Sequence, residues 1–411
     1  MPGPGMDIIG NEERKALLEV IESGYLYRYG DLSDQKFKAM VWNLEKEFAN
    51  YVGSKYTLAV NSGTSALLTA LWALGIGPGD EVIVPGYTFI ASITSIIFAR
   101  AIPILAEVDK SLTLDPDDVV QKISPNTKAI MLVHMLGNPG HLKEISKIAL
   151  ENNLYLIEDC AQAFGATYNQ KSVGTFGEMG TFSLNVYKTI TAGDGGILIT
   201  DNEALYKRAF AIHDQGHLPL RQGVEQGKRT ILGLNFRMNE LTAAVARAQL
   251  KKTPYIKEKL QKNKKYLKKR LTEIKEIEFR TILDKEGDVG TLLTFFLPTH
   301  KQASKLAAKL GTTTLAESGW HVYNNMEHFL NRKTVTTENC PFSCHFNISS
   351  NKEYQKGMLP KTDALLNRAI NISVGVSDVG LGSAFGIRIK SSEEEIERKA
   401  DFLVKTIRKV L

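Results

Sequence analysis

The fold is decided by the stretch TFSLNVYKTITAGDGG, residues 181–196. It begins within one apolar run, Gly180–Leu184, and its last glycine opens a second run, Gly196–Thr200. Continuous apolar runs of this length are typical of strands that are buried on both faces of a sheet. Lys188 comes four residues after the first run. The stretch therefore predicts two buried strands, with a lysine just beyond the carboxyl end of the first.

Similar runs precede this stretch and alternate with helical segments. The predicted strands are Tyr56–Val60, Glu81–Val84, Ile102–Val108, Ala129–Met135, Leu154–Asp159, Gly180–Leu184 and Gly196–Thr200. The predicted helices between them include Ser65–Leu74, Ile90–Ala99 and Leu142–Asn152. This alternation is typical of α/β proteins with a mostly parallel sheet. We expect seven strands, covered by helices on both faces.

The rest of the chain predicts a long helix followed by a smaller α/β unit. Its expected elements are a single helix at Asn239–Ile274, strands at Ile277–Leu283 and Thr291–Leu297, and helices at Gln302–Leu310 and Glu393–Val410. A chain of 411 residues exceeds the size of one ordinary hydrophobic core. We therefore predict a large domain with an N-terminal arm at residues 1–255 and a small C-terminal domain at residues 256–411.

The composition is that of a globular protein, with 43% hydrophobic and 23% charged residues. Basic residues gather at positions 257–270, which we interpret as the solvated face of the long helix, with Leu260, Tyr266 and Leu267 turned inward. No nucleic-acid motif accompanies this charge, so no nucleic-acid partner is predicted. The net charge of +6 suits an anionic cofactor or substrate.

The most apolar region, Val82–Val108, is interrupted by Pro85, Gly86, Arg100 and Pro103. Such a pattern predicts buried strands and a helix, not a membrane span. The N-terminus lacks the basic start and apolar stretch of a signal peptide. We therefore predict no membrane association and a cytoplasmic location.

The chain has three cysteines, Cys160, Cys340 and Cys344. So small and odd a number favours a reducing compartment over a disulfide framework. Cys340, Cys344 and His345 invite a zinc interpretation, but no second ligand pair stands at metal-site spacing. We predict a reduced thiol pair in a loop and no metal.

Chemistry-bearing residues follow three of the predicted strands, where ligands bind in doubly wound sheets. Asn61-Ser-Gly-Thr64-Ser65 opens a helix and is typical of an anion site, although Ser and Thr are also ordinary N-caps. Asp159 ends another strand; it is either a helix N-cap or the partner of a cation such as a protonated pyridine nitrogen. Lys188, if buried, has the lowered pKa that a Schiff-base amine needs.

Together these motifs identify a family. The runs NSGTSA (61–66), EDCAQAFGA (158–166) and FSLNVYKTITAGDGG (182–196) resemble the DegT/DnrJ/StrS sugar aminotransferases. The resemblance covers nearly the whole chain and implies an aspartate-aminotransferase-type (fold type I) enzyme that binds pyridoxal 5'-phosphate (PLP). It also implies a homodimer with shared active sites, an amino-acid donor such as glutamate, and a keto-sugar acceptor.

The resemblance also implies a role for individual residues. Lys188 would be the catalytic lysine that holds PLP as a Schiff base, and Asp159 would pair with the pyridine nitrogen. Gln162 would contact the ring hydroxyl, and Phe89 would stack on the ring. The phosphate would be held by Thr64, Ser65 and Ser183, and by Asn235 reaching into the neighbouring subunit.

One position departs from the family pattern. Many relatives have a histidine two residues after the serine matched by Ser183, where this chain has Asn185. This leaves the substrate contacts near the ring open. Some relatives replace the lysine with histidine and are dehydratases, an outcome that Lys188 argues against.

A finer resemblance concerns the acceptor. Glu22–Tyr29, Leu132–Gly137, Trp320–Asn325 and Leu359–Ala364 resemble aminotransferases that make 8-amino-3,8-dideoxy-octulosonate for lipopolysaccharide biosynthesis. This predicts the 8-oxo form of 3-deoxy-octulosonate as acceptor, whose carboxylate would need a cation. Candidates by motif position are Arg28, His217, His321 and Arg368, for each of which a structural role is an equal alternative.

Three alternative functions are each suggested by part of the sequence. One is a related aminotransferase for a nucleotide-linked 3-keto or 4-keto hexose. Another is an NAD enzyme, suggested by Gly75–Asp80, but this motif follows a helix and opens a strand, so it predicts a turn. The third is a PLP-binding regulator without turnover, although no DNA-binding module is recognisable.

Overall fold

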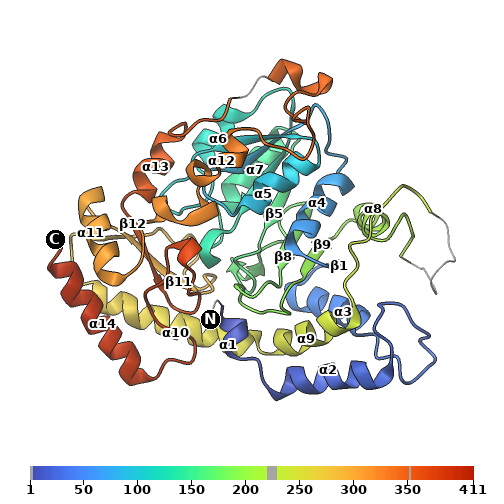
Figure 1. Ribbon diagram of the computed structural model, residues 1–411, viewed down its shortest axis with the longest axis horizontal. Helices are drawn as coiled ribbons and strands as arrows, with labels where there is room; N and C mark the ends of the chain where they lie inside the picture. Colours follow the sequence, from blue (N-terminus) through green and yellow to red (C-terminus); the bar gives the residue numbers. More distant parts are fainter. Residues whose placement is uncertain (1–2, 220–228, 351–352) are drawn as a thin grey trace.

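Seven strands form the central sheet in the order β1-β9-β8-β5-β4-β2-β3 (Figure 1). The structure is a computed structural model that describes residues 3–219, 229–350 and 353–411. The strands are β1 (Tyr56–Val60), β2 (Glu81–Pro85), β3 (Ile102–Ala106), β4 (Thr127–Val133), β5 (Tyr155–Asp159), β8 (Met179–Ser183) and β9 (Gly196–Thr200). β9 runs antiparallel to both of its neighbours, and the other pairings are parallel. The predicted sheet, mostly parallel and seven-stranded, is confirmed.

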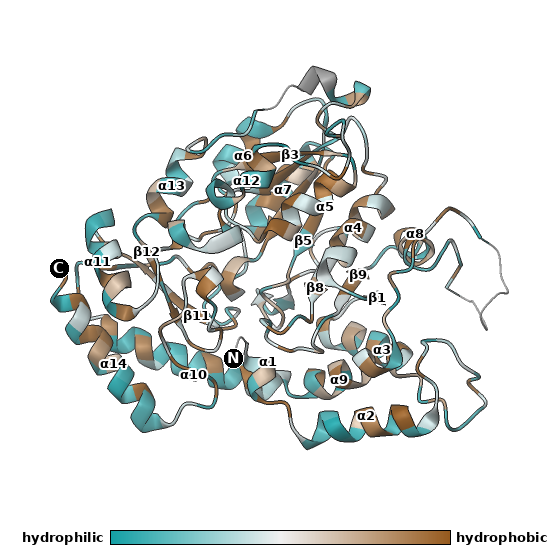
Figure 2. Cartoon of the chain, in the orientation of Figure 1, coloured by the Kyte–Doolittle hydropathy of each residue, from teal (hydrophilic) through white to brown (hydrophobic). Residues whose placement is uncertain are grey.

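Helices cover both faces of this sheet. α4 (Gly63–Ala73), α5 (Ile90–Phe98) and α8 (Glu203–His213) share one apolar cluster with Val82 and Val84 of β2. α3 (Met40–Val52), α6 (Pro116–Lys122), α7 (Leu142–Glu151) and α9 (Glu240–Lys251) contribute to the other cluster, together with Ile83. Adjacent residues of one strand thus serve opposite cores, which is why the strands are apolar throughout. Figure 2 shows the resulting hydrophobic strands between helices that are hydrophilic on their outer sides.

A second, antiparallel sheet of β10 (Glu278–Phe279), β11 (Leu292–Phe296) and β12 (Ala369–Ser373) lies beside the first unit. α10 (Thr253–Leu271), α11 (His300–Leu310) and α14 (Glu393–Arg408) gather around it (Figure 1). The predicted strand at 277–283 is reduced to two residues. The predicted domain boundary after residue 255 falls in the first turn of α10 and stays a prediction.

The remaining elements are short, apart from one N-terminal helix. They are α1 (Pro4–Asp7), α2 (Asn11–Ser23), β6 (Thr167–Tyr168), β7 (Lys171–Ser172), α12 (Glu327–Leu330), α13 (Pro360–Leu366) and the 3₁₀ turns Met135–Gly137, Leu315–Glu317, Gly319–His321, Tyr323–Asn325, His345–Ser350 and Val379–Leu381. Gly75–Asp80 forms the predicted turn between α4 and β2.

The prediction of one helix at 239–274 is wrong. α9 ends at Lys251 and α10 begins at Thr253. Pro254 explains the break, because it has no N–H to continue the hydrogen bonds of α9 and its ring clashes with the carbonyl four residues earlier. Within α10, Leu260 and Leu267 face inward as predicted.

Two further expectations about side chains are corrected. Tyr266 is 36% exposed and does not turn inward, and Lys264 is a buried member of the basic run, paired with Asp288. Cys340 and Cys344 form a disulfide and are not a reduced pair. A tight turn brings their Cα atoms to 5.3 Å, within the range that a disulfide spans. Among the described residues, no helix combines the length and the apolar character needed to cross a membrane.

Candidate active site

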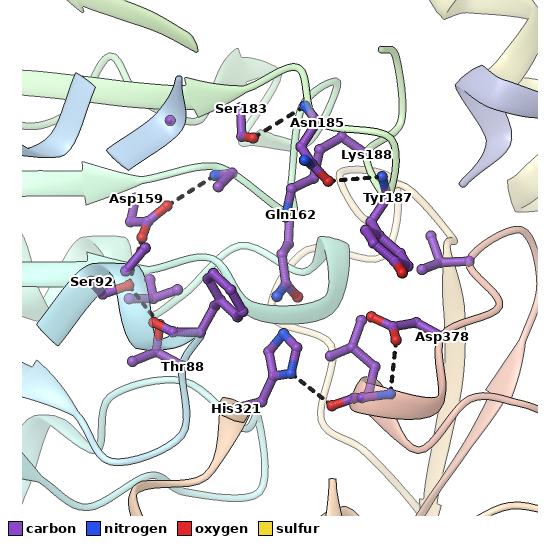
Figure 3. Close-up of a pocket in the computed structure, with 18 of the residues that line it drawn as sticks. Thr88, Ser92, Asp159, Gln162, Ser183, Asn185, Tyr187, Lys188, His321 and Asp378 are labelled. Carbon is purple, nitrogen blue, oxygen red and sulfur yellow. Dashed lines mark hydrogen bonds between the residues drawn. The ribbon is translucent and has the colours of Figure 1, made fainter. Parts of the chain in front are cut away.

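A cavity of about 590 Å³ lies at the carboxyl ends of β5 and β8 (Figure 3). Its walls come from the start of α4, the segments after β2, β5 and β8, and the segments around His321 and Asp378. Of the residues singled out from sequence, those that line it are Thr64, Phe89, Asp159, Gln162, Ser183, Asn185, Lys188 and His321. Residues 133 positions apart in the chain, Lys188 and His321, therefore share one cavity.

The start of α4 forms one end of the cavity. Ser62 is the N-cap, and its Oγ accepts a hydrogen bond from the Ser65 N–H (3.1 Å). Within the described structure, the N–H groups of Gly63 and Thr64 have no partner. Gly63 packs against Ser183, since a Cβ built on this glycine would lie 2.8 Å from the Cβ of the serine. Two free N–H groups and the Ser183 hydroxyl thus converge on a site suited to a phosphate.

Asp159 lies at the end of β5 and is 4% exposed. Its Oδ1 accepts from the Ala161 N–H (3.0 Å) and its Oδ2 from the Ser92 hydroxyl (2.7 Å). The Ser92 hydroxyl is also 2.7 Å from the Thr88 hydroxyl. In the described part of the chain, Asp159 has no ion pair with a basic side chain. A buried carboxylate that lines a cavity and forms no ion pair with a described residue is suited to a positively charged ligand atom.

Gln162 and Phe89 also line the cavity. The Gln162 Oε1 accepts from the Leu136 N–H (3.1 Å), which orients the side-chain amide and leaves its N–H groups for the cavity. Phe89 lines the cavity and is 42% exposed. The centroid of its ring lies 5.1 Å from the centroid of the His321 ring. An exposed aromatic face of this kind is suited to stacking on a flat ligand.

Lys188 stands in the hairpin that joins β8 to β9. The hairpin is closed by hydrogen bonds from the Ala192 N–H to the Leu184 carbonyl (2.9 Å) and from the Leu184 N–H to the Gly195 carbonyl (2.9 Å). Burial lowers the pKa of Lys188, while the charges of Asp159 and Asp378 act in the opposite direction. Within the described residues, its ammonium has no hydrogen bond or ion pair. The amine is therefore available for chemistry in the cavity.

The N-terminal segment supports this hairpin. A Cβ on Gly3 would lie 2.7 Å from the carbonyl carbon of Tyr187 and 2.8 Å from the carbonyl oxygen of Lys188. Only a glycine permits this backbone approach. Residues 1–5 contain no recognisable motif that would predict a role at the site.

Asp378 is a lining residue that the sequence analysis missed. It caps the 3₁₀ turn Val379–Leu381, and its Oδ1 accepts from the Gly380 N–H (2.8 Å). Burial raises its pKa, and the charge of Lys188 partly offsets this effect. The preceding residues, Ser373 to Ser377, contain no motif that would place an aspartate in a catalytic cavity.

The other residues singled out from sequence lie elsewhere. Arg28 is fully buried and paired with Glu45 (3.1 Å), His217 is 1% exposed, and Arg368 bonds the carbonyl oxygen of Leu297 (3.3 Å). None of these three lines the cavity. Ser65 is also absent from the lining, and Asn235 is exposed on the segment after α8. The roles predicted for Ser65 and Asn235 stay predictions.

One buried cluster, His134, Glu158 and Cys160, has metal-ligand chemistry. The His134 Nδ1 accepts from the Gly140 N–H (2.9 Å), so its Nε2 carries the proton and donates to Glu158 (3.0 Å). Glu158 also accepts three backbone N–H groups, those of Gly174, Phe176 and Gly177. Both side chains are thus satisfied by the protein and serve to hold the segment after β5.

The residues that line the cavity fit PLP. Gly63, Thr64 and Ser183 offer donors for a phosphate, and Asp159 offers the negative charge that a pyridinium nitrogen requires. Gln162 would hold the ring hydroxyl and Phe89 would stack on the ring. Lys188 is the amine at the same cavity.

Comparisons with known proteins agree with this site. The model of the DegT/DnrJ/EryC1/StrS aminotransferase family matches residues 7–377. GDP-perosamine synthase of Vibrio cholerae is 39% identical over 257 residues, which are 62% of this chain and 65% of that protein. The dTDP-3-amino-3,6-dideoxy-alpha-D-galactopyranose transaminase of Aneurinibacillus thermoaerophilus is 34% identical over 318 residues, 71% of this chain and 83% of that one.

The match to the Vibrio protein thus spans slightly less than two thirds of its length. Among solved structures, an aminotransferase from Psychrobacter cryohalolentis is similar with a TM-score of 0.79 and 25% identity, covering 100% of this chain and 99% of that one. The fold is accordingly the fold type I architecture of PLP-dependent aminotransferases.

Proposed function

Since the chain belongs to the DegT/DnrJ/EryC1/StrS aminotransferase family, whose members depend on PLP, we propose that it moves an amino group from an amino acid to a keto sugar. The proposal rests on one cavity, which is lined by both the Asp159 carboxylate and the Lys188 amine. Asp159 forms no ion pair with any basic residue that the structure describes. Glutamate is the proposed donor.

In the proposed reaction, bound PLP supplies an electron sink for negative charge at the carbon that bears the amino group. Asp159 would keep the pyridine nitrogen protonated, and Ser92 and the Ala161 N–H hold the Asp159 carboxylate in place. Burial lowers the pKa of Lys188, so that more of its amine is neutral and able to act as a nucleophile. The same Nζ then takes and returns the proton during amino transfer, a role worth roughly 10²–10⁴-fold in rate.

For the acceptor, we propose a keto hexose linked to a nucleotide. Two relatives, the GDP-perosamine synthase and the dTDP-sugar transaminase, are named for nucleotide-linked amino sugars, and neither name mentions an octulosonate. Lys188 is the single cationic side chain among the described lining residues of the cavity. A free sugar acid would need a cation for its carboxylate, and Arg28, His217 and Arg368 lie outside the cavity.

The test is spectroscopic first and chemical second. The purified protein with PLP should show the absorbance band of lysine-bound PLP, and glutamate should convert this band to that of the aminated cofactor. Lys188→Ala should abolish the conversion, while Lys147→Ala, at an exposed lysine of α7, should not. No band after PLP is added would contradict the proposal. A band that no amino acid converts would favour a PLP-binding regulator instead.

The aminated protein is then offered two acceptors. These are GDP-4-keto-6-deoxymannose, as a nucleotide-linked sugar, and the 8-oxo form of 3-deoxy-octulosonate. Amination of the first alone supports the proposal, and amination of the second alone would restore the octulosonate prediction. A homodimer with shared sites, with Asn235 reaching the neighbouring subunit, and a cytoplasmic location remain part of the proposal.

A further inference from the structure

His321 presents a hydrogen-bond acceptor to the cavity. Its Nδ1 lies 2.7 Å from the backbone carbonyl oxygen of Gly380, which can only accept, so Nδ1 carries the proton. The Nε2 atom therefore has a free lone pair, and it points into the cavity toward Gln162 (Figure 3). Burial lowers the pKa of His321 to about 4, and the charge of Lys188 acts in the same direction. The ring is thus neutral near pH 7 and is not the cation that the sequence analysis considered.

The position of this ring is fixed from several sides. The Thr88 N–H donates to the His321 carbonyl oxygen (3.0 Å), and the next residue, Val322, forms a β-bridge with Tyr87. The ring itself packs against Phe89. A group held this way can select between ligands, because little entropy is lost when it binds.

Asp378 presents a second acceptor beside it. The backbone around this residue is held by hydrogen bonds from its N–H to the Ser383 hydroxyl (3.1 Å) and from the Ser383 N–H to its carbonyl oxygen (2.9 Å). The Oδ1 atom accepts from Gly380, whereas Oδ2 has no partner in the described structure. Figure 3 shows this carboxylate on the same side of the cavity as His321, across from Lys188.

We propose that His321 Nε2 and Asp378 Oδ2 form an acceptor wall that recognises the hydroxyl groups of the keto-sugar acceptor. This inference rests on the proposed aminotransferase function and identifies the specificity-determining residues of that site. Both atoms accept hydrogen bonds and neither donates one, so they are complementary to O–H groups. A sugar carries several such groups, whereas the deprotonated carboxylates of 2-oxoglutarate carry none.

The two half-reactions of an aminotransferase allow a direct test. The variants are Asp378→Asn, which keeps an oxygen for the Gly380 N–H, and His321→Phe, which keeps a ring against Phe89. Each holoenzyme is first aminated with glutamate. It is then mixed either with GDP-4-keto-6-deoxymannose or the octulosonate, whichever the wild type converts, or with 2-oxoglutarate, which has no hydroxyl groups.

We expect each variant to lower kcat/KM for the keto sugar by roughly 10- to 100-fold, the effect of losing one hydrogen bond to a charged or buried group. Amination by glutamate and reaction with 2-oxoglutarate should fall at least tenfold less than the reaction with the keto sugar, because neither uses these hydrogen bonds. Loss of the Asp378 charge, which raises the Lys188 pKa, would affect the reactions with both acceptors alike. Binding of the corresponding amino-sugar product, measured by calorimetry, should weaken by a similar factor. This second readout does not depend on turnover.

Matched controls exist outside the cavity. His300 also donates from Nδ1 to a backbone carbonyl (Asn367, 3.0 Å), and Asp115 also caps a helix by accepting an N–H two residues on (Asp117, 3.1 Å). His300→Phe and Asp115→Asn should behave like the wild type with every substrate.

Two results would overturn the inference. Equal losses with the keto sugar and 2-oxoglutarate would show that the residues act on PLP or Lys188, and unchanged kinetics with the keto sugar would show that they do not contact it. Failure of the wild type to be aminated by glutamate would instead refute the proposed function itself.

Discussion

Acidification should destabilise the protein in part through the buried histidine His213. Its Nδ1 donates to the carbonyl oxygen of Phe210 (2.6 Å), and its Nε2 therefore accepts from the guanidinium of Arg28 (2.9 Å). Arg28 is 0% exposed and His213 is 0% exposed. A proton on Nε2 would lie against a buried cation, so the folded protein resists protonation here.

The magnitude follows from the pKa difference between the folded and unfolded states. Burial, together with the Arg28 charge, lowers the pKa of His213 to about 3, against ~6.5 in an unfolded chain. Above pH ~6.5 neither state binds a proton at this ring, so its contribution does not change with pH. Below that pH the unfolded state alone becomes protonated, and stability falls by ~1.4 kcal/mol per pH unit. The loss from this group reaches ~2 kcal/mol at pH 5.0 and levels off only near pH 3.

The assay is denaturant unfolding of the wild type and of His213→Gln at pH 7.5, 6.0 and 5.0. Glutamine can still accept from Arg28 but does not titrate, and the other groups titrate in both proteins. The stability advantage of the wild type at pH 7.5 should therefore shrink by ~2 kcal/mol at pH 5.0. His328→Gln, at an exposed ring, serves as the control and should keep the wild-type dependence on pH. An advantage that stays constant from pH 7.5 to 5.0 would refute the reasoning.

Two further predictions concern the phosphate end of the cavity and a buried ion pair. Gly63→Ala should weaken PLP affinity by roughly tenfold in a fluorescence titration, because the new Cβ would lie 2.8 Å from the Cβ of Ser183 and displace one donor; unchanged affinity would contradict this. Asp288→Ala should lower the free energy of unfolding by about 3–5 kcal/mol in urea, because it leaves the buried Lys264 ammonium without its partner. Lys264→Met combined with Asp288→Leu should restore most of that loss, and a double variant as unstable as the single one would argue against the ion pair as its cause.

The sequence predicted the secondary-structure elements whose residues all share one environment. The continuous apolar runs, such as Gly196–Thr200, predicted the buried strands because each face of the sheet has its own core. Pro254 is a local signal for the break between α9 and α10. The prediction of one helix followed the helical periodicity of the segments on both sides and gave this proline too little weight. The disulfide had no such signal, because a separation of four residues permits bonding only in a particular turn.

Some residues of the candidate site could likewise be predicted from sequence, and others could not. Asp159, Ser183 and Lys188 could be placed together because they follow parallel, neighbouring strands of one sheet, whose carboxyl ends meet at one edge. His321 could be singled out only by resemblance, and Asp378 not at all. Both belong to irregular segments in the C-terminal part of the chain, and the position of His321 depends on long-range contacts such as the bridge between Tyr87 and Val322.

The two sides of the cavity differ in how freely their residues can be substituted. The cofactor side of the cavity is tied to the register of the central sheet, so altering it would disturb the core around β5 and β8. The acceptor wall is carried by two short segments, at residues 319–321 and 378–381, that no strand of the central sheet includes. Substitutions at His321 or Asp378 should therefore redirect the choice of sugar while PLP binding and the reaction with glutamate persist. The half-reaction experiment on the Asp378→Asn and His321→Phe variants measures this separation directly.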